Sequence, residues 1–600
     1  MGPIEHEESH RQAFNTVTDK GQSHMDRKLL SWVNDQNTEG IKPLAIAAAV
    51  AREAAIQKGL PFDGNQPNLL DIGTAQAPKE IEYTAEMIGS VYEQSLDSSI
   101  RRHGGVHYTP YEVAKRLAKI TLNELPPGPI CDPSVGGGAF LLAAAEYLAE
   151  KGASPNKIIK DYLWGIDLDR GAIEVARASI SIWGSTKAWI VLNEHLVVAN
   201  SLKSGMKSFP TPPKRGFTAV IGNPPFQNQL QEITVRPIKE TQTLREKWKV
   251  NAGPYADTAG YFLLVALSML SSEGKCLLIQ PQSILATVDA KPIREKLNQE
   301  ATLEGIWIGG PGIFEAGVNV CAPLLSKGLR QSPANIWTGT EITQLQKKLN
   351  QGENWSSAMA IAQGVPVLKL KGNPLEERAS ATAGFRDQFY GLAPHVCEFK
   401  TGMETVAPLI TVGMIDPLRS RWGSNEFRYA GKSWLKPVVN LTSLQADDKE
   451  LYEWVQDRLK PKVLLATQTK VLEVLPDPEG QLIPSTPTIS IECDPEEIWK
   501  ITSALSSAAI SAYAFSRVAG SALSSDTIKL SAKQVNALPL PPISDYWEQA
   551  SQYAQEAFSS KLKDTKTNKM KEMSHKISLA YGYDDDQLEE WWIKRLPKWR

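Results

Sequence analysis

The chain has 600 residues, and its 65 lysines and arginines nearly balance its 67 aspartates and glutamates, which leaves a formal net charge of −2. This length predicts more than one domain, and a hydrophobic content of 42% permits ordinary cores. Neither a run of about eighteen apolar residues nor a signal-like N-terminus occurs, so we expect no membrane span and no secretory leader. Five cysteines without CxxC spacing and eight histidines without an HExxH pattern indicate neither a disulfide framework nor a metal site. We therefore expect a cytoplasmic protein.

Residues 1–82 are predicted to form an N-terminal helical region, because the Ala-rich segment 43–59 is typical of a helix. This region could pack on the domain that follows it or support a partner subunit. Glu39 and Lys42 have the wrong spacing for the ExK pair of a nuclease, and the region is too short for a nuclease and a linker. We expect no nuclease activity from it.

A helix with a strong start signal is predicted next. Thr109 is expected to cap this helix, with Pro110 at its first position and Glu112 completing a capping box. Its apolar face would consist of Val113, Leu117 and Ile120.

A strand, a glycine-rich turn and a second helix follow. The strand ends at Asp132, the turn contains the glycines 136–138, and the Ala- and Leu-rich helix covers 141–149. Glycines let the backbone approach a ligand closely, and an aspartate can accept hydrogen bonds from an amine or a hydroxyl. No P-loop Lys-Ser/Thr follows, so an adenosine-type ligand is favoured over a nucleoside triphosphate. A further strand, 162–166, ends at Asp167, an acid that could hold both hydroxyls of a ribose.

The sequence Asn223-Pro224-Pro225-Phe226 directly follows an apolar run, Phe217–Gly222, that predicts a buried strand. An asparagine amide, a proline-fixed turn with its carbonyl groups and an aromatic face form a compact clamp for a planar amine. The N6 group of adenine is such an amine. Taken alone, the tetrapeptide could equally be a turn that is followed by a core aromatic residue.

These segments resemble the S-adenosylmethionine-dependent DNA adenine-N6 methyltransferases, in the class whose cofactor motifs precede the catalytic motif and whose target recognition domain comes last. The resemblance covers about residues 83–327. It implies an α/β fold, with a mainly parallel, seven-stranded Rossmann-like methyltransferase sheet in a catalytic domain at 83–330. The remaining segments would be a linker at 331–354, an α+β DNA target recognition domain at 355–545 and a C-terminal helical tail at 546–600.

The resemblance implies a pocket for S-adenosylmethionine. Asp132 and two glycines would surround the methionine part under a loop that contains Thr109, and Asp167 would bind the ribose. Asn200 stands where the family usually has an aspartate that reads the adenine, so its amide can form hydrogen bonds but brings no charge. Phe262 lies near the cofactor in the family but could equally be a core aromatic residue. The expected cofactor-binding residues are Thr109, Asp132, Pro133, Gly136, Gly138, Asp167, Asn200 and Phe262.

The catalytic residues that the resemblance implies are Asn223, Pro224, Pro225 and Phe226. The Asn223 side-chain oxygen and the Pro224 carbonyl would each accept one N6 hydrogen of an adenine that is flipped out of the duplex. Phe226 would stack on the base, and the nitrogen lone pair would then point at the methyl group. This chemistry needs no metal and no covalent intermediate. A cytosine-C5 methyltransferase needs a nucleophilic cysteine after a proline, and no cysteine of this chain follows a proline.

In the predicted recognition domain, residues 419–436 contain five basic residues against one acidic residue, a local charge of +4, interleaved with four aromatic residues. Basic groups for phosphates beside aromatic rings for bases suit a nucleic-acid groove. The alternative is a solvated, β-rich surface with aromatic cross-strand pairs. Farther on, residues 501–513 predict one apolar helix. The candidate DNA-binding residues are Arg419, Arg421, Trp422, Arg428, Lys432 and Lys436.

We therefore expect a site-specific DNA adenine methyltransferase, acting as the modification component of a restriction-modification or phage-defence system. Its expected partners are double-stranded DNA and, as an open alternative, a separate restriction or specificity subunit. Enzymes that methylate RNA bases or protein glutamine share this clamp, but the long region after residue 330 favours DNA. A non-catalytic DNA-binding subunit is the other alternative. The intact segments 132–138 and 223–226 oppose a decayed pocket, and Asn200 is the departure that supports one.

Overall fold

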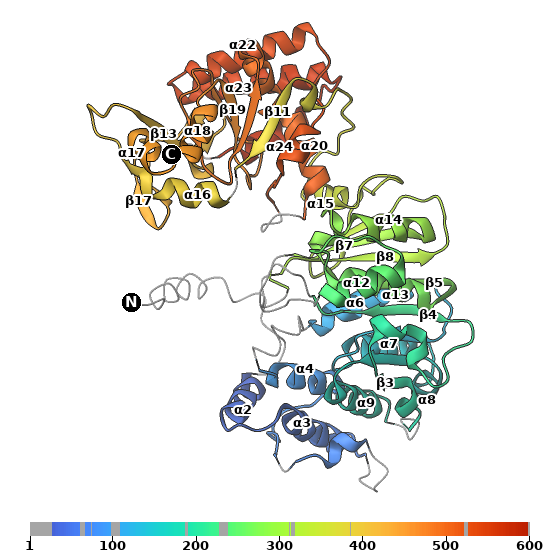
Figure 1. Ribbon diagram of the computed structural model, residues 1–600. Helices are drawn as coiled ribbons and strands as arrows, with labels where there is room; N and C mark the ends of the chain where they lie inside the picture. Colours follow the sequence, from blue (N-terminus) through green and yellow to red (C-terminus); the bar gives the residue numbers. More distant parts are fainter. Residues whose placement is uncertain are drawn as a thin grey trace. The chain divides into compact units, whose positions relative to one another are not determined.

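The computed structural model divides the chain into two compact units, Met1–Glu353 and Asn354–Arg600 (Figure 1). Each unit has its own sheets and its own buried core. The structure describes residues 27–60, 67–73, 75–97, 109–185, 190–226, 238–310, 312–313, 318–384, 386–520 and 526–597.

A single sheet organises the first unit. Its order is β10-β9-β7-β8-β5-β4-β1-β2-β3, and a short strand, β6, pairs with β8. Strands β3, β2, β1, β4 and β5 are parallel neighbours, whereas β8 runs antiparallel to both β5 and β7. The strands are β1 (Ile130–Asp132), β2 (Leu163–Asp167), β3 (Leu196–Val198), β4 (Phe217–Gly222), β5 (Leu270–Leu278), β6 (Gln280–Pro281), β7 (Ala301–Ile308), β8 (Val320–Lys327), β9 (Asn335–Thr338) and β10 (Thr343–Gln344).

The predicted mainly parallel, seven-stranded sheet is confirmed by the seven neighbouring strands β3-β2-β1-β4-β5-β8-β7. Three further strands extend it to ten, and two of them lie in the segment 331–354 that was predicted as a linker. Strand β9 pairs with β7, and the ring of Trp337 lies where a Cβ on Gly305 would be only 2.2 Å away. The missing side chain at Gly305 leaves room for the tryptophan, so this segment continues the sheet instead of linking two domains.

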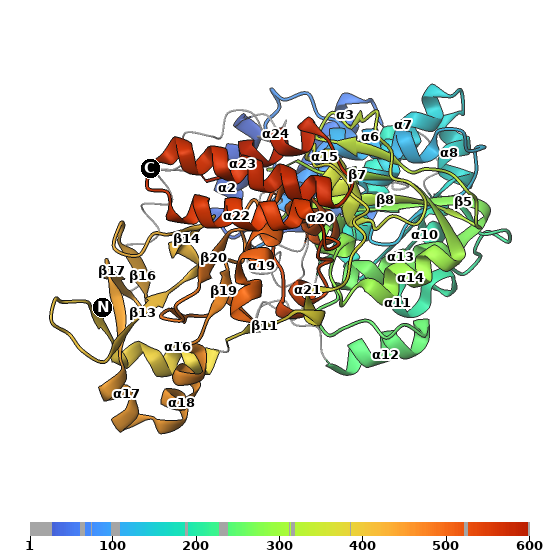
Figure 2. The ribbon, with the colours of Figure 1, turned by 90° about the horizontal axis from the view of Figure 1, so that it is seen from above.

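Helices cover both faces of this sheet, as Figure 2 shows. One layer contains α6 (Tyr111–Leu122), α7 (Ala139–Glu150) and α9 (Arg170–Gly184), and the other contains α11 (Ser201–Ser204), α13 (Thr258–Met269) and α14 (Lys291–Glu300). Helix α13 is apolar on nearly all sides, as expected of a helix with both faces buried. The remaining helices of this part are α8 (Pro155–Asp161), α10 (Leu192–His195) and α12 (Ile238–Trp248).

The N-terminal helices of the first unit share a second buried core with α9. They are α2 (Arg27–Thr38), α3 (Pro43–Gln57) and α4 (Ala85–Ser95). Small side chains on α3 let it approach α4 and α9 closely, and the shared core includes Val50, Val91 and Val175. Helix α3 therefore packs against α9 of the domain that follows, which is the first of the two possibilities for region 1–82, and support of a partner subunit stays a prediction.

The second unit combines two four-stranded sheets, two short hairpins and ten α-helices within its described residues. One sheet has the order β11-β22-β19-β20, and the other has β12-β18-β13-β21. This mixture confirms the predicted α+β character. The strands are β11 (Ala379–Ala383), β12 (Val396–Glu398), β13 (Val406–Ile410), β14 (Ile415–Asp416), β15 (Arg419–Ser420), β16 (Phe427–Tyr429), β17 (Lys432–Trp434), β18 (Pro437–Asn440), β19 (Lys462–Leu465), β20 (Val474–Asp477), β21 (Ile483–Pro484) and β22 (Ile489–Cys493).

The apolar helix predicted at 501–513 is two helices. The first ends at Leu505, and the second begins at Ala508 with the hydroxyl of Ser507 accepting a hydrogen bond from Ile510 N at 3.3 Å. Serine hydroxyls compete for backbone groups and therefore favour helix ends. The helices of this unit are α15 (Ser356–Ala362), α16 (Arg386–Leu392), α17 (Leu441–Asp447), α18 (Lys449–Arg458), α19 (Ile498–Leu505), α20 (Ala508–Val518), α21 (Ala532–Asn536), α22 (Asp545–Ser559), α23 (Lys563–Ala580) and α24 (Asp586–Arg595).

Candidate active site

A pocket lies at the carboxyl ends of three parallel strands, where β1, β2 and β4 end at or next to polar residues. Strand β1 ends at Asp132, β2 ends at Asp167, and Asn223 directly follows β4. Loops at this edge of an open α/β sheet are where ligands usually bind. The sequence-predicted residues that line the pocket are Thr109, Asp132, Pro133, Gly136, Asp167, Asn200, Asn223, Pro225 and Phe262.

Asp132 is the most buried acid of the pocket, with 2% of its surface exposed. Its Oδ1 accepts a hydrogen bond from Ser134 N at 2.9 Å. The pKa of Asp132 is raised to about 8, mainly by burial; hydrogen bonding from Ser134 lowers it, and the nearby acids Asp167 and Glu93 contribute to the rise. A Cβ on Gly222 would lie 2.3 Å from the Asp132 Oδ1, so glycine at the end of β4 makes room for this carboxyl group.

The Asp167 carboxylate, at the end of β2, is hydrogen-bonded to the backbone of the glycine turn. Its two oxygens accept hydrogen bonds from Gly136 N and Asp169 N, both at 2.9 Å. Gly136 has a positive φ of 52°, which a glycine adopts without strain. Burial raises the pKa of Asp167. Its expected role toward a ribose remains a prediction.

Gly138 does not line the pocket. It has a φ of 91° and precedes the first residue of α7, and a Cβ there would lie 3.3 Å from the side chain of Ala176. This glycine therefore serves the helix start and its packing on α9.

Asn200 lies in the pocket wall and also begins a helix. Its Oδ1 accepts a hydrogen bond from Lys203 N at 3.2 Å, so it is the N-cap of α11. Asparagine and aspartate are about equally good N-caps. Asn200 therefore preserves the start of α11 as an aspartate would, while the pocket has one negative charge fewer than is usual in the resembled family.

Asn223 is held by Thr109. The Asn223 Nδ2 donates a hydrogen bond to the Thr109 Oγ1 at 2.9 Å, across 114 positions of the chain. This contact replaces the predicted capping box, because α6 begins only at Tyr111, Pro110 precedes it, and no side chain caps the helix. With its nitrogen directed at Thr109, the amide group presents its oxygen on the opposite side.

Asn223 and Phe226, which flank the two prolines, lie in different surroundings. Pro225 lines the pocket with Asn223, whereas Phe226 is only 7% exposed and belongs to the hydrophobic core of the unit. Phe226 therefore lies in the hydrophobic core, which is the alternative that the sequence left open for it. Phe262, on α13, is both a pocket residue and a buried core residue.

Glu93, on α4, is a pocket residue to which the sequence assigned no role. Its Oε1 accepts a hydrogen bond from Gly137 N at 3.2 Å. The segment Ile88–Gln94 resembles a family motif, but neither spacing nor periodicity shows that its one acid, Glu93, reaches the glycine turn. A close contact between two glycines, which is a tertiary feature, brings Glu93 there.

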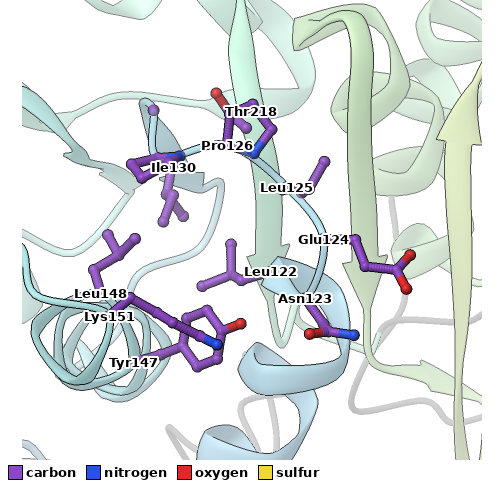
Figure 3. Close-up of a pocket in the computed structure, with 12 residues that line it drawn as sticks. Leu122, Asn123, Glu124, Leu125, Pro126, Ile130, Tyr147, Leu148, Lys151 and Thr218 are labelled. Carbon is purple, nitrogen blue, oxygen red and sulfur yellow. The ribbon is translucent and has the colours of Figure 1, made fainter.

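A second hollow lies near the amino ends of β1 and β4 (Figure 3). It is formed by the turn after α6, by Tyr147 and Lys151 on α7, and by Thr218 on β4. The Lys151 ammonium lies 5.5 Å from the centre of the Tyr147 ring. None of the predicted site residues lines this hollow.

The candidate DNA-binding residues surround two hairpins of the second unit. Arg428 and Lys432 are exposed on the hairpin β16–β17, in which Phe427 pairs with Trp434 across the strands. The alternative prediction of aromatic cross-strand pairing is thereby confirmed for one pair, and it is compatible with exposed basic residues on the same hairpin.

Three other candidate residues, Arg421, Trp422 and Lys436, contact neighbouring residues of the second unit. The Arg421 guanidinium lies 5.2 Å from the Phe427 ring centre and 3.9 Å from an Asp416 oxygen. Trp422 Nε1 donates a hydrogen bond to the Pro437 carbonyl, and the Lys436 ammonium lies 5.9 Å from the Trp422 ring centre. These distances describe contacts within the protein, and the DNA interface stays a prediction.

Three further features bear on the chemistry. Among the described residues, no group of three or more His, Cys, Asp or Glu side chains is arranged to hold a metal ion. Within the same residues, no helix has the length and apolar character needed to cross a membrane. Burial raises the pKa of the Cys276 thiol to about 12, so this cysteine is protonated near neutral pH.

The chain is similar to known methyltransferases over part of its length. The chain is 25% identical to the Type II methyltransferase M.VspI of Vibrio sp. (strain 343) over 194 residues, which are 32% of this chain and 41% of that protein. It is 27% identical to the Type II methyltransferase M.XamI of Xanthomonas campestris pv. amaranthicola over 177 residues, 29% of each protein. The match thus spans less than half of the length of either curated relative.

A solved structure shares the fold. The Type IIL restriction-modification enzyme MmeI, solved in complex with DNA, aligns with a TM-score of 0.58 and 11% identity over 98% of this chain and 92% of that chain. Residues 84–361 match the family of N-6 DNA methylases. This stretch contains the glycine turn, the three pocket acids and the Asn-Pro-Pro-Phe sequence. The segment 84–361 of this chain is therefore similar to the N-6 DNA methylase family.

Proposed function

We propose that this protein transfers a methyl group from S-adenosylmethionine to the N6 atom of adenine in DNA. The observation that carries the proposal is the position of Asn223, which is fixed by Thr109 at the end of β4 and lines the same pocket as Asp132 and Asp167. The family of the segment 84–361 supports the same reaction class.

The pocket suits S-adenosylmethionine. Its glycine turn offers close backbone approach, and Phe140, Leu168 and Phe262 offer apolar surface for an adenine ring. Its ionisable lining residues are acids, which match a cofactor with a positive sulfonium and an ammonium group. Asp167 would hold the ribose hydroxyls, and the wall around Asn200 would contact the adenine. The bound cofactor would supply an electrophilic methyl group.

The residues of the chain would prepare the nitrogen that receives this methyl group. The N6 lone pair of adenine is delocalised into the ring, so the nitrogen is a weak nucleophile until it becomes pyramidal. The Asn223 Oδ1 and the Pro224 carbonyl would each accept one N6 hydrogen and thereby direct the lone pair out of the ring plane. Thr109 orients the amide before the base arrives, which reduces the reorganisation needed during transfer.

DNA is the proposed substrate, and the adenine would leave the duplex to reach the pocket. The second unit supports this choice, because Arg428 and Lys432 are exposed on a hairpin where they can meet phosphates. The matched relatives are named Type II methyltransferases. We therefore place the protein as the modification component of a restriction-modification or phage-defence system in the cytoplasm, with a separate restriction or specificity subunit as its proposed partner.

A transfer assay tests the proposal. The full chain is incubated with S-adenosylmethionine that carries a labelled methyl group and with unmethylated duplex DNA, and the modified nucleosides are then identified. We expect N6-methyladenine at one recurring sequence. Asn223→Ala should lower the transfer rate by about 100-fold or more, because one acceptor for the N6 hydrogens is lost.

The control variant is Asn193→Ala, since Asn193 is exposed on α10 and does not line the pocket. It should methylate DNA at the parent rate. Equal transfer by Asn223→Ala and the parent would refute the catalytic assignment. Cofactor binding without transfer to DNA would refute the substrate, and the same label would then be followed into RNA and into protein glutamine.

A further inference from the structure

Helix α4 reaches the pocket by packing its backbone against the glycine turn. A Cβ on Gly89 would lie 2.7 Å from the carbonyl oxygen of Gly137, and one on Gly137 would lie 2.4 Å from the Cα of Gly89. These distances exclude a side chain at either position without a shift of the backbone. Because residues four apart share one face of a helix, this contact carries Glu93 to the same turn.

Glu93 is fixed on the pocket wall that this turn forms. Its Oε1 accepts the hydrogen bond from Gly137 N, and a Cβ on Gly136 would lie 3.0 Å from that oxygen. The preceding residue, Tyr92, donates from its hydroxyl to Asp169, the N-cap of α9. The helix is therefore anchored at Gly89 and at Tyr92, and Glu93 directly follows the second anchor.

The charge of the pocket makes this position significant. The lining residues include the three acids Glu93, Asp132 and Asp167, and the described lining contains no lysine, arginine or histidine. Acids that face one cavity repel each other, so a ligand with positive charge at this wall is favoured. An ammonium group can donate hydrogen bonds to a carboxylate, whereas a sulfonium group has no hydrogen to donate.

We propose that Glu93 binds the α-ammonium group of the methionine part of S-adenosylmethionine. The inference rests on the proposed function and adds a binding residue to its pocket. The glycine turn is the part of the pocket that the family resemblance assigns to the methionine moiety, and Glu93 is the acid hydrogen-bonded to the middle glycine of that turn. The N-terminal helices would then be part of the cofactor site, because α4 belongs to their core.

Ligand binding by the full chain tests this proposal without any methyl transfer. Calorimetric titration would compare three ligands on the parent and on Glu93→Gln: S-adenosylmethionine, S-adenosylhomocysteine and 5′-deoxy-5′-methylthioadenosine. The first two carry the α-ammonium group, and the third carries none. Glutamine keeps an oxygen that can accept from Gly137 N, so the variant removes charge while it retains the local hydrogen bond.

We expect Glu93→Gln to weaken both ammonium-bearing ligands about tenfold and to leave 5′-deoxy-5′-methylthioadenosine within twofold of the parent. Glu150→Gln, at the exposed far end of α7, should change none of the three affinities. Equal weakening of all three ligands would show that Glu93 only supports the turn, and unchanged affinities would show that it does not contact the ligand. Either result overturns the proposal.

The proposed function can fail separately. If the parent binds S-adenosylhomocysteine in a Glu93-dependent way but transfers no methyl group to DNA, the substrate is wrong and the binding inference stands. If the parent binds none of the three ligands, both fail.

Discussion

Asp132 is a pocket acid whose ionisation departs far from ordinary behaviour, because its pKa is raised to about 8, mainly by burial. An aspartate in an unfolded chain loses its proton near pH 4. Between these two values the folded state holds a proton that the unfolded state has released, so rising pH lowers the stability of the folded state in this range. The penalty grows by about 1.4 kcal/mol for each pH unit, until the pKa of the folded state is reached.

Asp132→Asn should therefore stabilise the ligand-free protein increasingly between pH 5 and pH 8. An asparagine oxygen can still accept from Ser134 N, but the side chain cannot ionise. Thermal unfolding of the parent and the variant at pH 5, 6.5 and 8 measures the effect. The two melting temperatures should be closest at pH 5 and most different at pH 8. A constant difference over this range would contradict the prediction.

The sequence was sufficient to predict which residues stand at the strand ends, but not which contacts their side chains make. Apolar runs that stop at Asp132, Asp167 and Asn223 place these residues at one sheet edge, since parallel strands end together. The hydrogen bond from Asn223 to Thr109 was not predictable, because it joins residues far apart in sequence. The burial of Phe226 likewise depends on packing, and its sequence context allowed both positions.

At the scale of elements, long and strongly patterned segments were predicted well. Strand β4 has the predicted bounds, Phe217–Gly222, and the predicted strand ending at Asp167 is β2. The missed strands β9 and β10 are four and two residues long, too short for a periodic pattern. The helix break at Ser507 was missed because the apolar pattern continues through it.

The contact between α4 and the glycine turn gives a prediction at this scale. Gly89→Ala would place a methyl group 2.7 Å from the Gly137 carbonyl oxygen, so the helix or the turn must move. We expect about a tenfold or greater loss of S-adenosylmethionine affinity and a lower melting temperature, because both the pocket wall and the packing are displaced. Calorimetric titration and thermal unfolding measure the two effects.

Gly310→Ala is the matched control, since its added Cβ would have no neighbour closer than 3.9 Å. It should keep the parent affinity and nearly the parent melting temperature. A Gly89→Ala variant that behaves like this control would show that α4 does not position the pocket.

At the scale of the whole molecule, the net charge of −2 does not suggest DNA binding, whereas the local charge of the segment 419–436 is the basis for predicting a DNA interface there. The structure divides the candidate residues into two kinds. Arg421 and Trp422 contact neighbours in their own unit, so changing them would also disturb folding. Arg428 and Lys432 are exposed, which makes them the clean probes of DNA binding.

The double variant Arg428→Ala and Lys432→Ala should weaken DNA binding at every sequence and reduce its salt dependence. Each lost phosphate contact lowers the slope of log affinity against log salt by about 0.9. Fluorescence anisotropy with a labelled duplex between 50 and 200 mM salt measures this slope, and cofactor affinity should not change. Lys449→Ala, an equally exposed change on α18, should leave the slope as it is. An unaltered slope in the double variant would remove the hairpin β16–β17 from the interface.

The division of the chain was predicted in outline only. A change in pattern near residue 331 was visible, but the boundary between units follows Glu353, because the sheet accepts two more strands first. Whether a short apolar segment pairs with an existing sheet edge depends on the shape of that edge. At β7 the decisive feature is the space above Gly305, which no local pattern in the segment 331–354 reveals.

The meeting of Gly89 and Gly137 also limits how this protein can evolve. Most tight contacts can be relieved by trimming the opposing side chain, so a substitution at one position is tolerated after a change at the other. Here each missing side chain would meet main-chain atoms, and main-chain atoms are the same for every amino acid. No second substitution can restore the fit. Descendants of this sequence that keep the pocket should therefore retain both glycines together, and a lineage that loses one should lose its pocket geometry rather than adapt it.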